Sequence, residues 1–341
     1  MQVSKQVVRH FLYAAIALAA FLATSALIHA LLPPMIPKGV AAKLRYFSEH
    51  KDDFDTLFVG TSHFYYGISP AIFDQTTRAA GLPTRTFNFG IDGMHPPENF
   101  YVLEQILKSP SQNLKWVFIE MGEIETKLKG NELGTERLLY WHDWPRTVLT
   151  IQKTLNPRDG LKWYDNVSRI WVARRVLALH LGLFAKRFTN VGRAVDWSAA
   201  SNDEDSKLEL GPAGDGYRIA GSAMPPDRAA IFQQTLALEL TSARPRAVDR
   251  YTESAYRDAA AKVRGLPSTP IFVSTPVIFQ SLLQFRAAPP PGLVLSFNDA
   301  RAYPAFYDSA VRIDDGHLTR EGAEQFTRVL AQEFIRHVRQ P

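Results

Sequence analysis

The segment Asp55-Thr-Leu-Phe-Val-Gly60-Thr-Ser62-His63 decides the fold, because it joins a short apolar run to a glycine and a serine. A run of this length that ends at glycine predicts a strand buried on both faces. Similar runs recur at 84–89, 115–121, 269–274 and 292–297. Segments with helical spacing of apolar residues alternate with them, at 70–80, 97–108 and 320–338. This alternation predicts an α/β fold with a parallel sheet and helices on both faces.

The composition of the 341 residues limits the classes of protein to consider. With 46% hydrophobic and 21% charged residues, the chain has enough apolar side chains for a sizeable core, which excludes wholesale disorder. The absence of cysteine excludes disulfides, thiolate metal sites and cysteine nucleophiles. The net charge of +5 is small and is not gathered in a basic stripe, so we expect no nucleic acid partner.

An apolar segment near the N-terminus predicts a membrane anchor. Residues 11–32 are 22 residues without a formal charge, and Lys5 and Arg9 precede them. About 20 apolar residues span the core of a bilayer, whereas cleaved signal sequences have apolar regions of about 7–15 residues. We therefore expect an uncleaved anchor at 11–32 after a short tail at 1–10. Cleavage near Thr24-Ser25-Ala26 and a buried core helix are the alternatives.

The rest of the chain divides by its sequence pattern. Residues 33–50 are expected to be a linker, and residues 51–125 and 265–341, which contain the strands, are expected to form the catalytic domain. Residues 126–264 interrupt the alternation and are expected to form a mostly helical insertion. The first part of this insertion, 126–200, has 13 basic and 6 acidic side chains, which suits the steering of an anionic polymer.

Three residues near the two ends of the sheet domain predict nucleophilic catalysis. Ser62 directly follows the first strand, and Asp314 lies three residues before His317. One turn can therefore deliver a carboxylate that orients an imidazole, whose other nitrogen faces a serine. Because the carboxyl ends of parallel strands share one edge of a sheet, Ser62 and the Asp314–His317 turn can meet there.

Gly90 ends the second strand on the same edge of the sheet. A glycine lets its backbone N–H approach a ligand closely. With the N–H of Ser62, the N–H of Gly90 is expected to form an oxyanion hole, in which one donor is typically worth about 10²–10³ in rate.

These residues resemble the SGNH (GDSL-like) hydrolase superfamily. The motifs that carry the resemblance are Gly60-Thr-Ser62 with Gly67-Ile-Ser-Pro70, Asn88-Phe-Gly90, and Asp314-Asp-Gly-His317-Leu-Thr-Arg-Glu-Gly-Ala323. Within the superfamily, the chain is similar to a membrane-anchored bacterial branch related to alginate O-acetyltransferase. The resemblance implies a flavodoxin-like parallel sheet without a cofactor. It also implies that Ser62 is the nucleophile, His317 the base, Asp314 its orienter and Gly90 an oxyanion donor.

The sequence departs from the superfamily pattern after the third strand. The superfamily places an asparagine there, whose amide donates to the oxyanion, but this chain has Glu120-Met-Gly-Glu123. An ionised glutamate cannot donate a hydrogen bond. In addition, His63 stands where the branch often has arginine. The departures leave a weakened esterase, a transferase or a lapsed enzyme as possibilities.

Four further residues are candidates for substrate binding. His63 and His95 follow the first and second strands, where they can line a pocket. Trp141 and His142 belong to the stretch Trp-His-Asp-Trp, which offers flat aromatic faces beside polar groups and so suits a sugar. The alternative for both stretches is structural, a solvent-facing loop or a subdomain core. The histidines show no HExxH or paired spacing, so we expect no metal.

Together these features predict acyl-ester chemistry on a glycan. We expect an O-acetyltransferase or acetylesterase of an exported polysaccharide, working through an acyl-serine. The resemblance further implies a membrane-embedded acyl donor protein as partner, and a single-pass inner-membrane protein with its catalytic domain in the periplasm. The alternatives are a non-catalytic glycan-binding or assembly subunit that kept the fold, and a lipase or thioesterase.

Overall fold

The computed structural model describes residues 5–31, 36–128, 136–155, 165–189, 209–242, 244–278, 282–286 and 292–339. Contacts divide the chain into two compact units. The sheet unit comprises Lys38–Glu125 and Asn202–Pro341, and the helical unit comprises Met1–Pro37 and Thr126–Ser201. Each unit is described by itself below.

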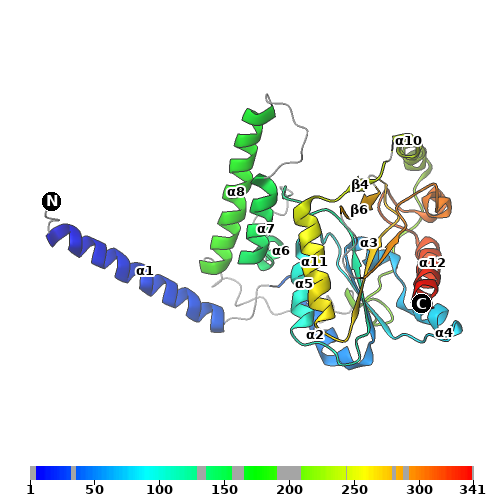
Figure 1. The fold of residues 1–341 in the computed structure, drawn as a ribbon, viewed down its shortest axis with the longest axis horizontal. Coiled ribbons are helices and arrows are strands. Elements are labelled where there is room, and N and C mark those ends of the chain that lie inside the picture. The colour runs from blue at the N-terminus through cyan, green and yellow to red at the C-terminus, as the bar shows by residue number, and fades with distance from the viewer. Residues whose placement is uncertain are drawn as a thin grey trace. The chain divides into compact units, whose positions relative to one another are not determined.

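The centre of the sheet unit is a five-stranded parallel sheet with the order β2-β1-β3-β5-β7 (Figure 1). Its strands are β1 (Thr56–Gly60), β2 (Thr86–Gly90), β3 (Trp116–Glu120), β5 (Thr269–Ser274) and β7 (Leu293–Ser296). All five coincide with the apolar runs of the sequence. The predicted α/β fold with a parallel sheet is therefore confirmed.

Helices cover both faces of the sheet because its side chains alternate between the faces (Figure 1). On one face, Phe58 of β1 stacks on Phe118 of β3 at 4.2 Å between ring centroids, and both pack against Phe73. The helices of this face are α4 (Pro70–Ala79) and α12 (Arg320–Arg339). On the other face, Tyr256 packs edge-on against Phe272 of β5. The helices there are α5 (Glu98–Leu107) and α11 (Arg250–Arg264).

The predicted linker at 33–50 is corrected from Lys38 onward. Residues Lys38–His50 form helix α2, which buries Val40, Ala42 and Phe47. The Phe47 ring lies 5.6 Å from that of Phe87 in β2. The segment is a helix and not a linker because it has an apolar face, which packs against the rest of the sheet unit. Residues 33–35 lie outside the described part.

The predicted insertion at 126–264 is too long at its C-terminal end. Helix α10 (Pro226–Ser242) and helix α11 belong to the sheet unit. The reason is the burial of large aromatic side chains: Phe232 of α10 belongs to the cluster of buried residues around Phe58, and Tyr256 of α11 packs on β5. Short strands β4 (Arg246–Ala247) and β6 (Leu283–Gln284) form a separate two-stranded sheet near them.

The helical unit contains α1 (Lys5–Leu31), α6 (Glu136–Tyr140), α7 (Trp144–Leu155) and α8 (Asp165–Thr189). Within α1, Lys5–Ile28 is long and apolar enough to cross a membrane, with a mean hydropathy of 2.2. It is the one helix of this kind in the described ranges. The hydroxyl of Ser25 donates to the backbone carbonyl of Phe188 in α8 at 2.7 Å, which ties α1 to the other helices of its unit.

Candidate active site

A tight turn after β1 presents Ser62 at the carboxyl edge of the sheet. The strand ends at Gly60, and α3 (Ser62–Gly67) begins two residues later. The hydroxyl of Thr61 accepts the backbone N–H of His63 at 3.1 Å and so caps this helix. A side chain at Gly60 would meet the Phe64 ring at 2.5 Å and the Glu120 carboxylate at 2.6 Å. Only glycine fits at this point of the turn.

The turn lies where the strand order reverses. From β1 the sheet extends to β2 on one side and to β3, β5 and β7 on the other. Open parallel sheets form a crevice at the carboxyl ends of the two strands that flank such a reversal. The crevice between β1 and β3 therefore has Ser62 on one wall and Glu120 on the other.

The structure brings Ser62, His317 and Asp314 into one chain of hydrogen bonds. Nε2 of His317 lies 2.7 Å from Oγ of Ser62. Nδ1 of His317 lies 2.9 Å from each carboxylate oxygen of Asp314. An ionised carboxylate only accepts hydrogen bonds, so Nδ1 carries the proton and Nε2 accepts the hydroxyl of Ser62. This is the arrangement in which an imidazole can deprotonate a serine.

The turn between Asp314 and His317 keeps the carboxylate ionised. Its Oδ1 accepts the backbone N–H groups of Gly316 and His317, each at 2.8 Å. Burial raises the pKa of Asp314, but the hydrogen bonds from the His317 ring and from these N–H groups outweigh it. The pKa therefore lies well below its usual range, and the carboxylate stays available to orient the imidazole.

Arg312 is a positioning residue that the sequence pattern does not reveal. Its side chain is fully buried, and burial lowers its pKa to about 10. The guanidinium donates four hydrogen bonds of 2.7 to 3.1 Å to backbone carbonyls, namely those of Pro276, Phe306, Asp314 and Asp315. Two of these carbonyls belong to the turn that carries the His317 imidazole. Arg312 thus holds this turn in place through its hydrogen bonds to the carbonyls of Asp314 and Asp315.

The predicted oxyanion role of Gly90 is corrected by its hydrogen bond. The N–H of Gly90 donates to Oδ1 of Asn88 at 2.8 Å, so it is not directed at a ligand. A side chain at Gly90 would meet the backbone N of Tyr65 at 2.3 Å, so glycine is needed here for the close approach of α3. For the N–H of Ser62, the described residues supply no acceptor. The predicted role of Ser62 as an oxyanion donor stays a prediction.

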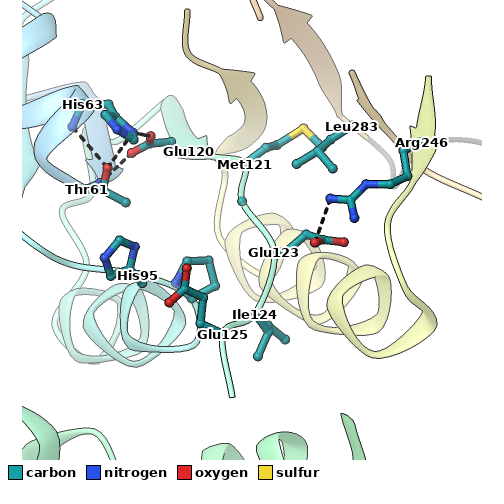
Figure 2. Close-up of a pocket in the computed structure, with 12 residues that line it drawn as sticks. Thr61, His63, His95, Glu120, Met121, Glu123, Ile124, Glu125, Arg246 and Leu283 are labelled. Carbon is teal, nitrogen blue, oxygen red and sulfur yellow. Dashed lines mark hydrogen bonds and ion pairs between the residues drawn. The ribbon is translucent and has the colours of Figure 1, made fainter. Parts of the chain in front are cut away.

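Glu120 and His63 form a second carboxylate–imidazole pair in the crevice (Figure 2). Oε1 of Glu120 lies 2.7 Å from Nδ1 of His63, and Oε2 accepts the N–H of Thr61 at 2.6 Å. The hydroxyl of Thr275 donates to Oε1 at 3.2 Å. Burial raises the pKa of Glu120, but the His63 imidazole and the Thr61 N–H outweigh it, so the pKa is lowered. Glu120 thus replaces the expected asparagine with an acceptor.

A cavity of about 280 Å³ opens beside His63 (Figure 2). His95 lies on its wall, and its predicted contact with substrate stays a prediction. The cavity also has an ion pair of 2.8 Å between Arg246 and Glu123, and the exposed Glu125 lies at its rim. His63 lines both this cavity and the narrow cleft that His317 lines.

Trp141 and His142 do not form a sugar platform. Trp141 is 3% exposed and His142 is fully buried, and their rings stack at 3.8 Å inside the helical unit. Nε2 of His142 lies 2.9 Å from Nδ1 of His180, a partner that the sequence pattern does not suggest. The prediction is corrected because the aromatic face that a sugar needs is covered by protein.

No family model, curated protein or solved structure matches this chain. Within the described part of the chain, no group of three histidine or acidic side chains is arranged to hold a metal ion.

Proposed function

We propose that this protein is a membrane-anchored serine enzyme that transfers or hydrolyses acyl esters of glycans. The observation that carries the proposal is the hydrogen-bonded chain from Ser62 through His317 to Asp314 at the crevice of the sheet. The strand order, which is 2-1-3-4-5 when the five strands are numbered along the chain, is that of flavodoxin-like sheets. It supports an SGNH-like fold together with the Gly60-Thr-Ser62 and Asp314-to-Ala323 motifs.

The reaction follows from the positions of the three side chains. Oγ of Ser62 attacks the acyl carbonyl while Nε2 of His317 takes its proton, and Asp314 stabilises the imidazolium. The tetrahedral intermediate collapses to acyl-Ser62, and the leaving alcohol takes the proton from His317. A sugar hydroxyl then attacks the acyl group, and His317 takes the proton of that hydroxyl. The new ester leaves, and His317 returns the proton to Oγ of Ser62. Water in place of the sugar gives hydrolysis.

The substrate and the location come from the resemblance and from the membrane helix. A helix of membrane-spanning length supports a single-pass membrane protein. The resemblance adds the inner membrane as its location, with the sheet unit in the periplasm. There it would meet an exported polysaccharide, with a membrane-embedded protein as acyl donor. The cavity beside His63 offers imidazole, carboxylate and guanidinium groups, which suit the hydroxyls of a sugar.

A second candidate function is a glycan-binding or assembly subunit without catalysis. Two observations favour it: the N–H of Gly90 is occupied by Asn88, and Glu120 is an acceptor in place of a donor. An enzyme that lost these two of its three expected oxyanion donors would bind its ester but activate the carbonyl poorly.

The deciding experiment uses the full-length chain in detergent with 4-nitrophenyl acetate. Release of nitrophenol and an acetyl group on Ser62, detected by mass spectrometry, support the enzyme. Ser62→Ala should abolish both, whereas Ser48→Ala, which changes an exposed serine of α2, should leave them unchanged. A folded protein that never carries acetyl-Ser62 but binds acetylated oligosaccharides would favour the second candidate.

A further inference from the structure

The pair of His63 and Glu120 lies directly beside the reactive serine. His63 follows Ser62 in the chain, and its ring centroid lies 5.4 Å from that of His317. Thus two imidazoles, each with a carboxylate on Nδ1, flank the crevice. The proposed reaction uses only one of them.

The orientation of His63 leaves one ring nitrogen for a ligand. Nδ1 faces Glu120 at 2.7 Å and the hydroxyl of Thr61 at 3.0 Å (Figure 2). Nε2 lies on the opposite side, where a Cβ added at Gly316 would approach it to 3.1 Å. Gly316 adjoins His317, and His63, Gly316 and His317 line one narrow cleft. Among the described residues, none forms a hydrogen bond with Nε2.

Glu120 is the charged group in contact with the His63 ring. Glu120 is 3% exposed, and the described residues give it no lysine or arginine partner. The carboxylate accepts from Thr61 and Thr275, and His63 is the group in contact that can also supply a positive charge. Because the ionised carboxylate only accepts, Nδ1 carries one proton, and a positive ring carries a second on Nε2. Other titratable groups line the same cavity and cleft or lie beside them: His317, Asp314, Tyr66, His95, Glu123, Glu125 and Arg246.

We propose that His63, held by Glu120, is an imidazolium whose Nε2–H donates to the oxyanion formed when Ser62 attacks an acyl carbonyl. The inference rests on the proposed function and names a catalytic residue for it, with Glu120 as its positioning residue. It supplies a donor in the crevice where Gly90 and the absent asparagine do not. No covalent bond to His63 forms or breaks, since the ring contributes charge and one hydrogen bond to the transition state.

His63→Ala tests the donor itself. Removing one oxyanion donor typically costs about 10²–10³ in rate, so kcat/KM for acetyl-Ser62 formation should fall by about that factor. His63→Gln should lose less, because its amide can also donate. His337→Gln, the same change on α12 away from the crevice, should have no effect. An unchanged rate in His63→Ala overturns the inference, while a parent protein that never acylates Ser62 overturns the proposed function.

Glu120→Gln separates a donor from a second general base. The Thr61 N–H needs an acceptor, so the new amide oxygen should face Thr61 and its NH₂ should face Nδ1 of His63. His63 would then be neutral with a proton on Nε2. If His63 is an oxyanion donor, it loses its charge in this variant but keeps its hydrogen bond, so the rate of acetyl-Ser62 formation should fall about tenfold. If His63 is instead a general base, it loses the unprotonated nitrogen that accepts a proton. A fall of 10² or more in this rate would therefore overturn the inference.

The protonation state of His63 can also be measured without a substrate. In the full-length chain labelled with ¹⁵N in the imidazole rings, His63 should show two protonated nitrogens at pH 7, and its signals should disappear in His63→Gln. In Glu120→Gln the same ring should become neutral. A neutral His63 in the parent at pH 7 would overturn the inference even if no variant were enzymatically informative.

Discussion

Histidine side chains have different roles in the two units of this molecule: His317 contacts a carboxylate and a serine, whereas His142 contacts another histidine. In the sheet unit, Nδ1 of His317 contacts the Asp314 carboxylate and Nε2 contacts the Ser62 hydroxyl. In the helical unit, His142 contacts His180, whose other nitrogen lies 2.9 Å from the carbonyl of Thr126. The His317 side chain is 26% exposed, whereas both rings of the helical pair are fully buried.

The difference shows what a histidine needs for chemistry. Burial lowers the pKa of His142 to about 3 and also lowers that of His180, so this pair stays neutral at pH 7. Its nitrogens are used within the protein. The His317 ring instead has the Asp314 carboxylate on one nitrogen and lines a cleft. A carboxylate on one nitrogen and access at the other are the features to look for.

The largest expected effect is that of Asp314→Asn on the rate. The amide would favour the wrong tautomer of His317, a change that typically costs about 10⁴ in kcat. Formation of acetyl-Ser62 by the full-length chain measures it. Asp315→Asn is the matched control, because that neighbouring side chain is exposed, and it should stay close to the parent. A loss below tenfold in Asp314→Asn would mean that the carboxylate is not needed for catalysis by His317. The proposed difference from His142, which lacks a carboxylate partner, would then be wrong.

The next effect in size is the destabilisation by Arg312→Met. Four backbone carbonyls, two of them buried, would lose their donor, and such losses together cost about 3 kcal/mol of the free energy of unfolding. The turn with Asp314 would also loosen, so the acylation rate per folded molecule should fall. Arg85→Met, at an arginine whose side chain is 62% exposed, should change stability by less than about 0.5 kcal/mol. Equal thermal unfolding midpoints for the two variants would contradict a structural role for Arg312.

The strands and the serine were predictable because they depend on local pattern. An apolar run that ends in glycine fixes the strand, and parallel strands must bring Ser62 and His317 to one edge. The role of Gly90 was not predictable. Its N–H donates to the side chain of Asn88, and an asparagine at that position is compatible with several local structures. Trp141 fits a sugar platform and a core equally well until its neighbours are known.

Long-range partners explain the other differences between sequence and structure. Arg312 looks like a surface residue in the sequence, and only the fold places four carbonyls around it. Glu120 looks like a loss of function, yet the structure pairs it with His63. Local pattern predicts which elements form. It does not predict which polar group from a distant segment will meet a given side chain.

Lys43 in the sheet unit is a second buried group, besides His142 in the helical unit, whose pKa burial lowers. Its Nζ donates to the carbonyls of Asn88, Gly90 and Gly216, and burial lowers its pKa to about 7. The unfolded chain keeps a lysine proton up to about pH 10.4 and therefore binds more protons between these values. Stability should thus rise with pH, by roughly 2 kcal/mol from pH 7 to pH 9.

The contribution of Lys43 is the part of this rise that Lys43→Met removes. Thermal unfolding of the parent and the variant in detergent at both pH values measures it, and Lys115→Met, at a side chain 65% exposed, serves as control. Parallel pH profiles for the parent and Lys43→Met would show that burial leaves Lys43 at an ordinary pKa.

The smallest expected effect concerns the helical pair in acid. His142 has a folded pKa of about 3 against about 6.5 when unfolded, so the unfolded chain binds more protons between these values. Stability should therefore decrease as the pH is lowered, by about 1 kcal/mol from pH 6.5 to pH 5.5. Fluorescence can report this unfolding because Trp141 stacks on His142. His142→Gln should remove the acid sensitivity without changing acylation of Ser62, whereas a matching loss of acylation would show that the two histidine pairs are coupled.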